Sequence, residues 1–276
     1  LKRLFVSLLI CSVFVQCARR GSPTGGPEDE TPPVVLRADP PQRNVNFKQD
    51  RVRIYFDEYI KLEKLNEQLV VSPPLEQTAY VISPQSQAAK YIEIAFLDSL
   101  APNTTYTFNF GESVIDNNEG NPFSFFSYVF SSGPAIDSLT VRGTISDAIA
   151  RSPESFVSVM LYPVDSTFTD SVIYKNKPLY YTNTLDSLIE FSIPNLKAGA
   201  YLLAAVKDVS KNYVFDPSVD KVDAIQHVIT LPNDSLFQLS LFKEELAFDF
   251  GKAYQAGEQR VGFGYKGNDA ITIELN

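Results

Sequence analysis

The first folded part of the chain alternates hydrophobic and polar residues with a period of two. In the segment RVRIYFDEYI, Val52, Ile54 and Phe56 fall on one side, and arginines and an aspartate fall on the other. The segments KYIEIAF and TTYTFNF repeat the alternation. This pattern predicts strands with one buried face, and Pro, Gly, Asn and Asp mark the turns between them. No amphipathic helix of useful length separates these runs, so residues 31–134 are predicted to form an antiparallel β-sandwich.

A second region, residues 135–242, continues the pattern. LTVRGTISDA and FVSVMLYPV have the alternation of strands, and EFSIPNLKAGAYLLAAVKD is interpreted as a strand, a turn and a further strand. Residues 201–206 are apolar on both faces, which places their strand in the middle of a core. The predicted fold class is therefore all-β, with two tandem antiparallel sandwiches.

The chain begins with a segment that has the length of a signal peptide. Lys2 and Arg3 precede an apolar run of about ten residues, which is too short to cross a bilayer. Residues 1–16 are therefore predicted to be a signal peptide. Residues 17–30 are rich in Gly, Pro and charge, and we expect them to form a flexible tether.

The apolar run is followed by a cysteine, Cys17, and this ending resembles a bacterial lipoprotein signal. In that signal the cysteine becomes the lipidated first residue of the mature protein. Phe14 and Gln16 depart from it, since they stand where an aliphatic and a small residue are typical. Cys11 lies inside the apolar run and is the weaker candidate. The resemblance implies lipidation at Cys17; the alternative is a secreted protein in which this cysteine occurs by chance.

Residues 243–276 contain two further strand-like runs. They are interpreted either as added strands of the second sandwich or as the start of a truncated third domain, and truncation is favoured because the surface lipoproteins that the chain resembles are typically longer.

Composition and the absence of common motifs exclude several classes of function. The formal charge is −9, from 24 basic and 33 acidic residues, so a nucleic-acid partner would be repelled. Both cysteines precede the folded regions, which excludes disulfides and thiolate chemistry there. The single histidine, His227, shares a side with Ile225 and Ile229 in an alternating run and is predicted to be partly buried. The motif GxSxG and Gly-rich phosphate loops are absent, so the chain is not predicted to be an enzyme.

The order of the segments resembles two known families. TPPVVLRADPPQRNVNF, RVRIYFDEYI, LAPNTTYTFNF and IDNNEGNPFSFFSYVFSSG resemble the bacterial immunoglobulin-like (Ig-like) domain named for S-layer proteins, which occurs in surface lipoproteins of Bacteroidetes-type bacteria. VRGTISDA, SVMLYPV and FSIPNLKAGAYLLAAVKD resemble the carboxypeptidase-regulatory, or transthyretin-like, β-sandwich. The first resemblance implies a structural spacer or adhesive unit. The second implies a rigid module that binds extended peptide or glycan at a sheet edge.

One loop, DVSKNYVFDPSVD, has oxygen-bearing residues at alternate positions, as a calcium loop requires. The predicted ligands are Asp208, Ser210, Asn212, Asp216 and Asp220, with the carbonyl of Val214. Tyr213 stands where an EF-type loop has glycine, and Val219 where it has a bidentate glutamate, so Asp220 or Asp223 would have to substitute. The alternative is an acidic surface turn.

Around Gly120, the segment IDNNEGNP is predicted to be a structural turn, with a ligand-facing loop as the second alternative.

The sequence therefore predicts a non-enzymatic lipoprotein of the cell envelope, anchored in the outer membrane through Cys17. Its two sandwiches would present or bind a protein or glycan partner. Two alternatives stay open: an accessory region of a larger hydrolase or carbohydrate-processing enzyme, and a peptide-binding assembly factor. The sequence leaves open the ligand, the oligomeric state, the choice between inner and outer membrane, and whether the protein faces the periplasm or the cell surface.

Overall fold

The alternating segments form the strands that their pattern predicts. The structure is a computed structural model that describes residues 29–152, 154, 156–184, 189–244, 248–258 and 260–267. Val52, Ile54 and Phe56 are buried, and Arg51 and Asp57 at the alternate positions are exposed. The period of two in the sequence is therefore the period of a strand with one face on a core.

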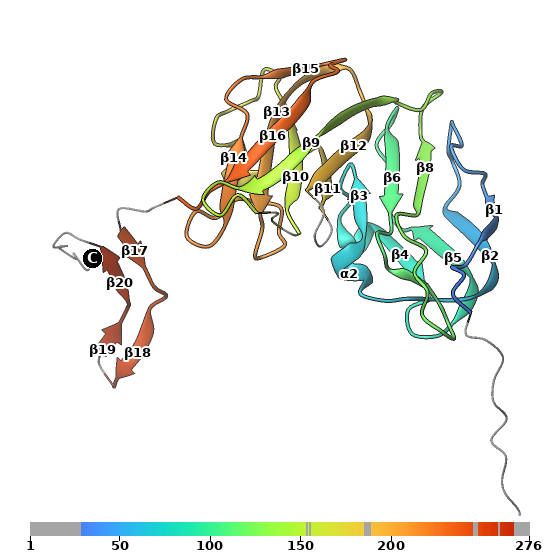
Figure 1. Cartoon of the computed structure of the whole chain (residues 1–276), viewed down its shortest axis with the longest axis horizontal. Coiled ribbons are helices and arrows are strands. Elements are labelled where there is room, and N and C mark those ends of the chain that lie inside the picture. The colour runs from blue at the N-terminus through green and yellow to red at the C-terminus, as the bar shows by residue number, and fades with distance from the viewer. Residues whose placement is uncertain are drawn as a thin grey trace, which may run out of the picture. The chain divides into compact units, whose positions relative to one another are not determined.

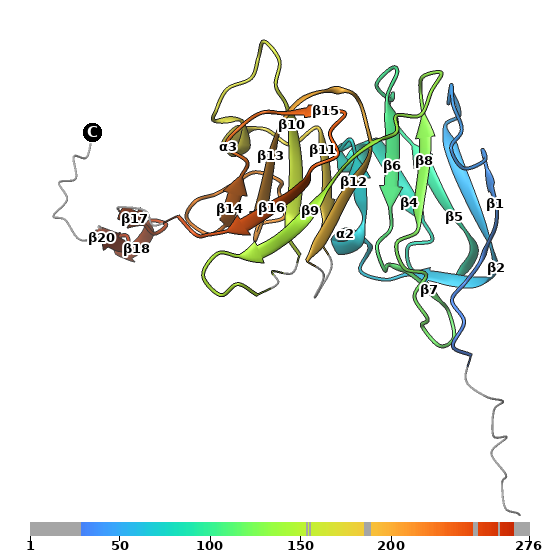
Figure 2. The same cartoon turned by 45° about the horizontal axis from the view of Figure 1, so that its top comes forward.

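Two sheets form the first sandwich (Figures 1 and 2). Sheet A has the order β1-β2-β5-β4 with β7 paired to β2, and sheet B has the order β3-β6-β8. The described strand pairs of both sheets are antiparallel. The elements are Val35–Asp39 (β1), Arg51–Leu62 (β2), Leu65–Gln68 (α2), Val70–Ser72 (β3), Gln77–Ala79 (η1), Tyr80–Ser83 (β4), Ala89–Phe96 (β5), Thr105–Asn109 (β6), Val114–Asp116 (β7) and Ser127–Ser131 (β8).

Aromatic rings fill the space between sheets A and B. The centroid of the Phe130 ring lies 4.3 Å from that of Phe47, 5.5 Å from that of Tyr106 and 5.6 Å from that of Phe96. Phe108 and Phe130 are fully buried. The Phe47 ring is tilted against Phe130, the Phe96 ring is edge-on and the Tyr106 ring is stacked. Such contacts add to the stabilisation that comes from burying apolar area.

The second sandwich is built from sheets C and D. Sheet C has the order β12-β9-β16, and sheet D has the order β11-β10-β13-β14 with β15 paired to β13. The elements are Leu139–Asp147 (β9), Ser158–Pro163 (β10), Val172–Lys175 (α3), Tyr180–Asn183 (β11), Glu190–Leu196 (β12), Gly199–Lys207 (β13), Lys221–Ala224 (β14), Ile229–Leu231 (β15) and Leu236–Leu241 (β16). The predicted all-β fold of Ig-like sandwiches is confirmed.

One strand pair departs from the antiparallel arrangement. β16 runs parallel to β9, because the chain crosses from sheet D to sheet C between β15 and β16. Gly143 lies where β9 is flanked by both neighbours. A Cβ atom there would be 2.0 Å from the carbonyl oxygen of Phe237 and 2.7 Å from the ring of Phe191. Glycine at this position lets the ring of Phe191 lie against the β9 backbone.

β13 is buried on both faces, as its sequence predicts. Tyr201, Leu203 and Ala205 contribute to the core between sheets C and D. Ala204 and Val206 contribute to a second hydrophobic cluster on the other face of sheet D, which α3 covers through Ile173.

The C-terminal strands pair with one another. β17 (Phe248–Phe250) pairs with β20 (Tyr265–Gly267), and β18 (Tyr254–Gly257) pairs with β19 (Arg260–Gly262). In the described part of the chain, these four strands belong to none of the sheets A to D. Whether they begin a third domain stays a prediction.

The prediction that His227 is partly buried in a strand is wrong. The run that contains it is divided into β14 and β15, and His227 lies in the bend between them, where it is exposed. Only Ile229, within β15, is fully inside the core. The sequence alternates across the bend, but the strand does not continue through it.

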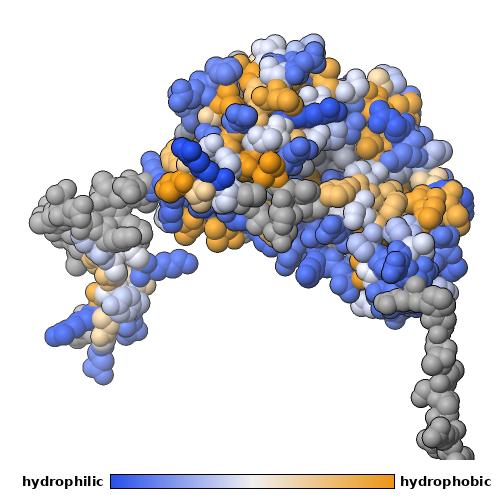
Figure 3. Space-filling view, viewed as in Figure 1, coloured by the Kyte–Doolittle hydropathy of each residue, from blue (hydrophilic) through white to orange (hydrophobic). Residues whose placement is uncertain are grey.

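The surface mixes polar and apolar side chains. On the face shown in Figure 3, hydrophobic areas are interspersed among hydrophilic ones. Exposed hydrophobic residues such as Leu36, Ile149 and Leu236 come from different elements.

A cluster of charges ties sheet C to sheet D. The Lys221 ammonium at the start of β14 lies 2.6 Å from Asp147 Oδ2 at the end of β9, and 2.8 Å from Glu154 Oε2. Asp147 also accepts hydrogen bonds from the backbone N–H groups of Ile149 and Ala150. The ammonium of Lys221, together with these N–H groups, lowers the pKa of Asp147 from 3.8 to about 2.

We expect this ion pair to make stability depend on pH. A lowered folded-state pKa means that the stabilisation is complete above the unfolded value of 3.8 and is lost as the pH falls towards 2. Asp147→Asn should therefore be less stable than the wild type at pH 6, and the difference should shrink between pH 4 and pH 2. Urea denaturation at each pH measures it. A difference that stays constant across that range would contradict the assignment.

Candidate functional site at the junction of the two sandwiches

The outer face of sheet B carries hydroxyl groups beside the apolar Val70 and Val129, and it is buried. Thr105 and Thr107 alternate with the aromatic core residues of β6, and Ser72 lies on the neighbouring strand β3. Their exposed fractions are 2%, 7% and 8%. Strands β11 and β12 of the second sandwich contact β3 and β6 here, so the second sandwich covers this face.

Tyr181 of β11 is the central contact of the junction. Its hydroxyl accepts a hydrogen bond from the backbone N–H of Val71 at 3.3 Å, and its own N–H donates to Ser72 Oγ at 3.3 Å. Its ring lies 4.4 Å from that of Tyr213. Burial raises the pKa of the Tyr181 hydroxyl well above its usual value, and the nearby Tyr213 raises it further. Tyr181 therefore remains neutral and joins the two sandwiches by both its ring and its hydroxyl.

A second polar contact lies on β12. Asn195 Nδ2 donates to Thr107 Oγ1 at 2.9 Å, and both side chains are buried. Asn195 has a φ of 60°, a left-handed conformation that asparagine adopts more readily than most residues. The N–H of Asp137 in the connecting segment donates to Thr105 Oγ1 at 2.9 Å. The hydroxyls of Ser72, Thr105 and Thr107 thus each have a defined partner in the second region.

Ion pairs lie at the edge of the junction. Lys177 lies 3.2 Å from Glu76, and Lys211 lies 3.9 Å from Glu67, while Lys197 donates to the carbonyl of Asn103. All of these lysines are on the second sandwich and their partners on the first. Exposed pairs of this kind contribute little to stability, so the buried contacts carry the junction.

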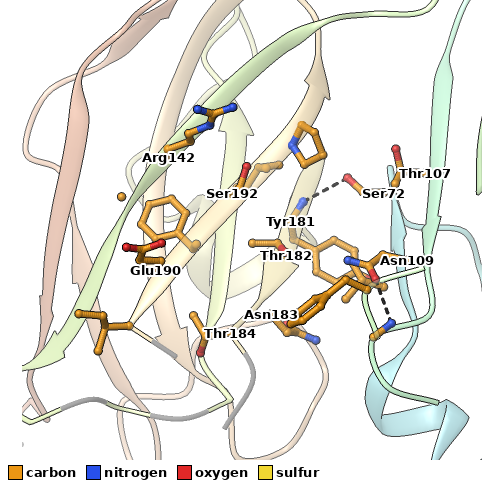
Figure 4. A pocket seen from close by; sticks show the side chains of 18 of the residues that line it. Ser72, Thr107, Asn109, Arg142, Tyr181, Thr182, Asn183, Thr184, Glu190 and Ser192 are labelled. Atoms are coloured by element: carbon orange, nitrogen blue, oxygen red, sulfur yellow. Dashed lines mark hydrogen bonds between the residues drawn. The ribbon is translucent and has the colours of Figure 1, made fainter. Parts of the chain in front are cut away.

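A groove of about 1070 Å³ opens beside the junction. Figure 4 shows Arg142, Ser192 and Glu190 on one side of it, and Thr107 and Asn109 on the other. The groove is therefore lined by hydroxyl, amide and charged groups from both sandwiches. Its volume lies slightly above the range of about 300–1,000 Å³ that is typical of small-molecule sites.

Two phenylalanines line the groove in an unusual conformation. Phe125 of the first sandwich has a φ of 60° and is 53% exposed, and Phe156 of the second has a φ of 53° and is 49% exposed. Left-handed backbone is costly for a bulky residue, and exposed aromatic rings gain little from folding. The two rings therefore add exposed apolar area to the groove.

The loop between β13 and β14 holds the five residues predicted to bind calcium. Asp216 Oδ1 accepts hydrogen bonds from the N–H and the hydroxyl of Ser218, at 2.9 and 2.7 Å. Asn212 Oδ1 accepts from the N–H of Val214 at 2.9 Å, and Ser210 is exposed. In the part of the chain that the structure describes, no three His, Cys, Asp or Glu side chains are grouped to hold a metal ion.

The other two residues of this set, Asp208 and Asp220, are buried. Asp220 Oδ1 accepts from the N–H of Val209 and Oδ2 from the N–H of Asp216, both at 2.9 Å. Asp208 Oδ2 accepts from the N–H of Tyr213 at 2.6 Å. Burial raises the pKa of Asp208, and the nearby Asp220 carboxylate adds to the increase, although the N–H donors oppose it.

The turn around Gly120 forms as predicted. Asp116 is 2% exposed, and its carboxylate accepts from the N–H groups of Asn118, Glu119 and Asn121 at 2.6–2.8 Å. It therefore organises the turn around Gly120, as the structural interpretation predicts.

Cys17, the predicted lipidation site, lies outside the described residues. Among the described helices, none is long and apolar enough to cross a membrane.

Sequence reasoning missed the junction. Tyr181 and Asn195 lie in short segments, and Thr105 and Thr107 have the alternation of a solvent-facing strand face. The one local signal is Asn195, a turn-former that follows Pro194 within a predicted turn.

Comparison with known proteins agrees with the fold of the first half. Residues 29–132 match the family described as a bacterial Ig-like domain, so the first sandwich is similar to that domain. No curated protein matches the chain.

Two solved structures are similar at low identity. The N-terminal part of the bacterial S-layer protein SbsC is 12% identical with a TM-score of 0.24, and the match covers 71% of this chain and 45% of that one. BcpA, the major pilin subunit of Bacillus cereus, is 8% identical with a TM-score of 0.24, and the match covers 77% and 71%. The chain thus spans less than half of the S-layer chain.

The junction can be tested by removing one hydroxyl. Tyr181→Phe leaves the buried N–H of Val71 without its acceptor, and we expect it to lower the free energy of unfolding by about 1–3 kcal/mol. Tyr174→Phe makes the same chemical change on a ring that is 44% exposed, and it should change stability by less than about 0.5 kcal/mol. Chemical denaturation measures both. Equal effects would show that the Tyr181 hydroxyl has no special role.

Proposed function

We propose that this chain is a non-enzymatic structural and adhesive module of the bacterial cell envelope. The observation that carries the proposal is the buried polar junction, in which Tyr181, Asn195 and the hydroxyls of Thr105 and Thr107 connect the two sandwiches. Buried hydrogen bonds of this kind specify one orientation, because any other orientation leaves polar groups unpaired. A two-sandwich unit with a fixed junction suits a spacer that holds a partner at a set distance.

The proposal includes a lipid anchor at Cys17 in the outer membrane. The sequence before Cys17 supports it, as do the Gly- and Pro-rich residues that follow. An extended tether of residues 17–30 would span up to about 50 Å. Such a tether holds the sandwiches clear of the bilayer and leaves their surfaces free for a partner.

The groove beside the junction is the surface that we propose for a protein or glycan partner. Phe125 and Phe156 offer apolar area, and Arg142 and Glu190 offer charged hydrogen-bonding groups. The resemblance of the second region to the transthyretin-like sandwich supports a binding role of this type. Among the described strands, β12 is at the edge of sheet C, where it pairs with β9, and an edge strand suits an extended partner.

A distance measurement tests the fixed junction. Spin labels on Lys90→Cys in β5 and Ser240→Cys in β16, with Cys11 and Cys17 replaced by serine, report the separation of the two sandwiches. We expect one narrow distance distribution, because the buried contacts allow one orientation. The same labels in a Tyr181→Phe, Asn195→Ala background should give a broader distribution. A broad distribution with the junction intact would contradict the spacer role.

Membrane fractionation tests the anchor. In bacterial cells the wild-type protein should sediment with membranes, and Cys17→Ser should move it to the soluble fraction because no acylated cysteine remains. Cys11→Ser is the matched control and should stay with the membranes. If Cys17→Ser stays there as well, the anchor at Cys17 is wrong.

A further inference from the structure

One buried oxygen atom lacks a partner. Among the described residues, Asp208 Oδ1 is the one buried side-chain oxygen or nitrogen without a hydrogen bond. Asp208 is only 8% exposed. An unsatisfied buried acceptor costs about 1–3 kcal/mol, and more when it carries charge. A native protein compensates such an atom with a proton, a water molecule or a cation.

A second carboxylate lies near Asp208, and the backbone N–H groups of Tyr213, Asn212 and Lys211 also act on the Asp208 carboxylate. Asp220 is fully buried in the same loop, and the two carboxylates are close enough to raise the pKa of Asp208. The lysines next to them in sequence are directed elsewhere. Lys207 lies 3.5 Å from Glu154, and Lys221 lies 2.6 Å from Asp147.

We propose that the loop of residues 208–220 binds a calcium ion through Asp208 Oδ1 beside the carboxylate of Asp220. Calcium accepts six to eight oxygen ligands in flexible geometry, including backbone carbonyls and water, whereas magnesium demands a near-ideal octahedron and releases its water reluctantly. A loop with two buried carboxylates therefore suits calcium better than magnesium. Asp216, Asn212 and both oxygens of Asp220 already accept backbone N–H groups, so Asp208 Oδ1 is the oxygen that the loop leaves for an ion, and the ligand set differs from the one that alternate spacing predicts.

Calcium bound at this site would stabilise the junction between the two sandwiches. Tyr213 donates its N–H to Asp208 Oδ2, and its ring contacts the Tyr181 ring. Phe215, two residues later, packs in the hydrophobic cluster on sheet D that also includes Tyr181. A cation at Asp208 would thus fix the loop that supports the central contact between the sandwiches.

Thermal unfolding with added calcium tests the proposal. Two carboxylates place the affinity in the weak class of extracellular modules, with a Kd of about 10⁻⁴–10⁻³ M. For a Kd of 1 mM, 10 mM Ca²⁺ should raise the folded-to-unfolded ratio about tenfold. The wild-type chain should respond in this way at constant ionic strength, and Asp208→Asn should not. Asp170→Asn removes the same charge from an exposed turn and should keep the response.

Three outcomes would overturn the site. No shift in the wild type, together with a stable Asp208→Asn variant, would mean that Asp208 is protonated instead. An equal calcium shift in Asp208→Asn would place the ion elsewhere. An equal shift with Mg²⁺ in all three proteins would reduce the effect to screening of the net negative charge.

Terbium luminescence gives a readout that does not need the variant to fold. Tb³⁺ takes the oxygen ligands of calcium, and Tyr213 beside Asp208 would sensitise its emission. We expect emission from the wild-type chain on excitation of tyrosine, and its loss as Ca²⁺ is added. Absence of sensitised emission, or emission that Ca²⁺ does not displace, would contradict the proposal.

Discussion

The arrangement of the two sandwiches depends on covering a sheet face that carries buried hydroxyl groups. Thr105, Thr107 and Ser72 place hydroxyl groups on the outer face of sheet B, and the second sandwich removes that face from water. Burying a hydroxyl is costly unless it gains a partner. Tyr181, Asn195 and the backbone of the connecting segment provide partners, so the two halves of the chain complete each other.

Much of the fold follows from the sequence, because alternation identifies a strand face that contacts a core. Tyr106, Phe108 and Phe110 are buried as their spacing predicts, and so are the apolar residues on both faces of β13. The same rule fails for the outer face of sheet B. Thr105 and Thr107 look like a solvated face, since alternation distinguishes two faces of a strand but does not say what lies beyond the polar one.

The loop residues illustrate a second limit of the sequence. Asp, Asn and Ser at alternate positions are typical of calcium loops, and they are equally typical of turns in which side chains accept backbone N–H groups. In this chain the side chains of Asp216 and Asn212 accept backbone N–H groups within turns. Asp208 and Asp220 differ from the other predicted ligands only in being buried. Burial depends on how β13 and β14 pack, which a local pattern does not contain. The prediction that His227 is partly buried is wrong for a related reason, because a bend interrupts the alternating run that contains it.

The parallel pairing of β16 with β9 has a mechanical consequence. These are the last and the first strands of the second sandwich, so tension along the chain would pull them in opposite directions along their length. Their hydrogen bonds would then be loaded together in shear, and the pair could not open one bond at a time as a zipper does. A chain pulled from both sides of the second sandwich would resist extension at this pair of strands.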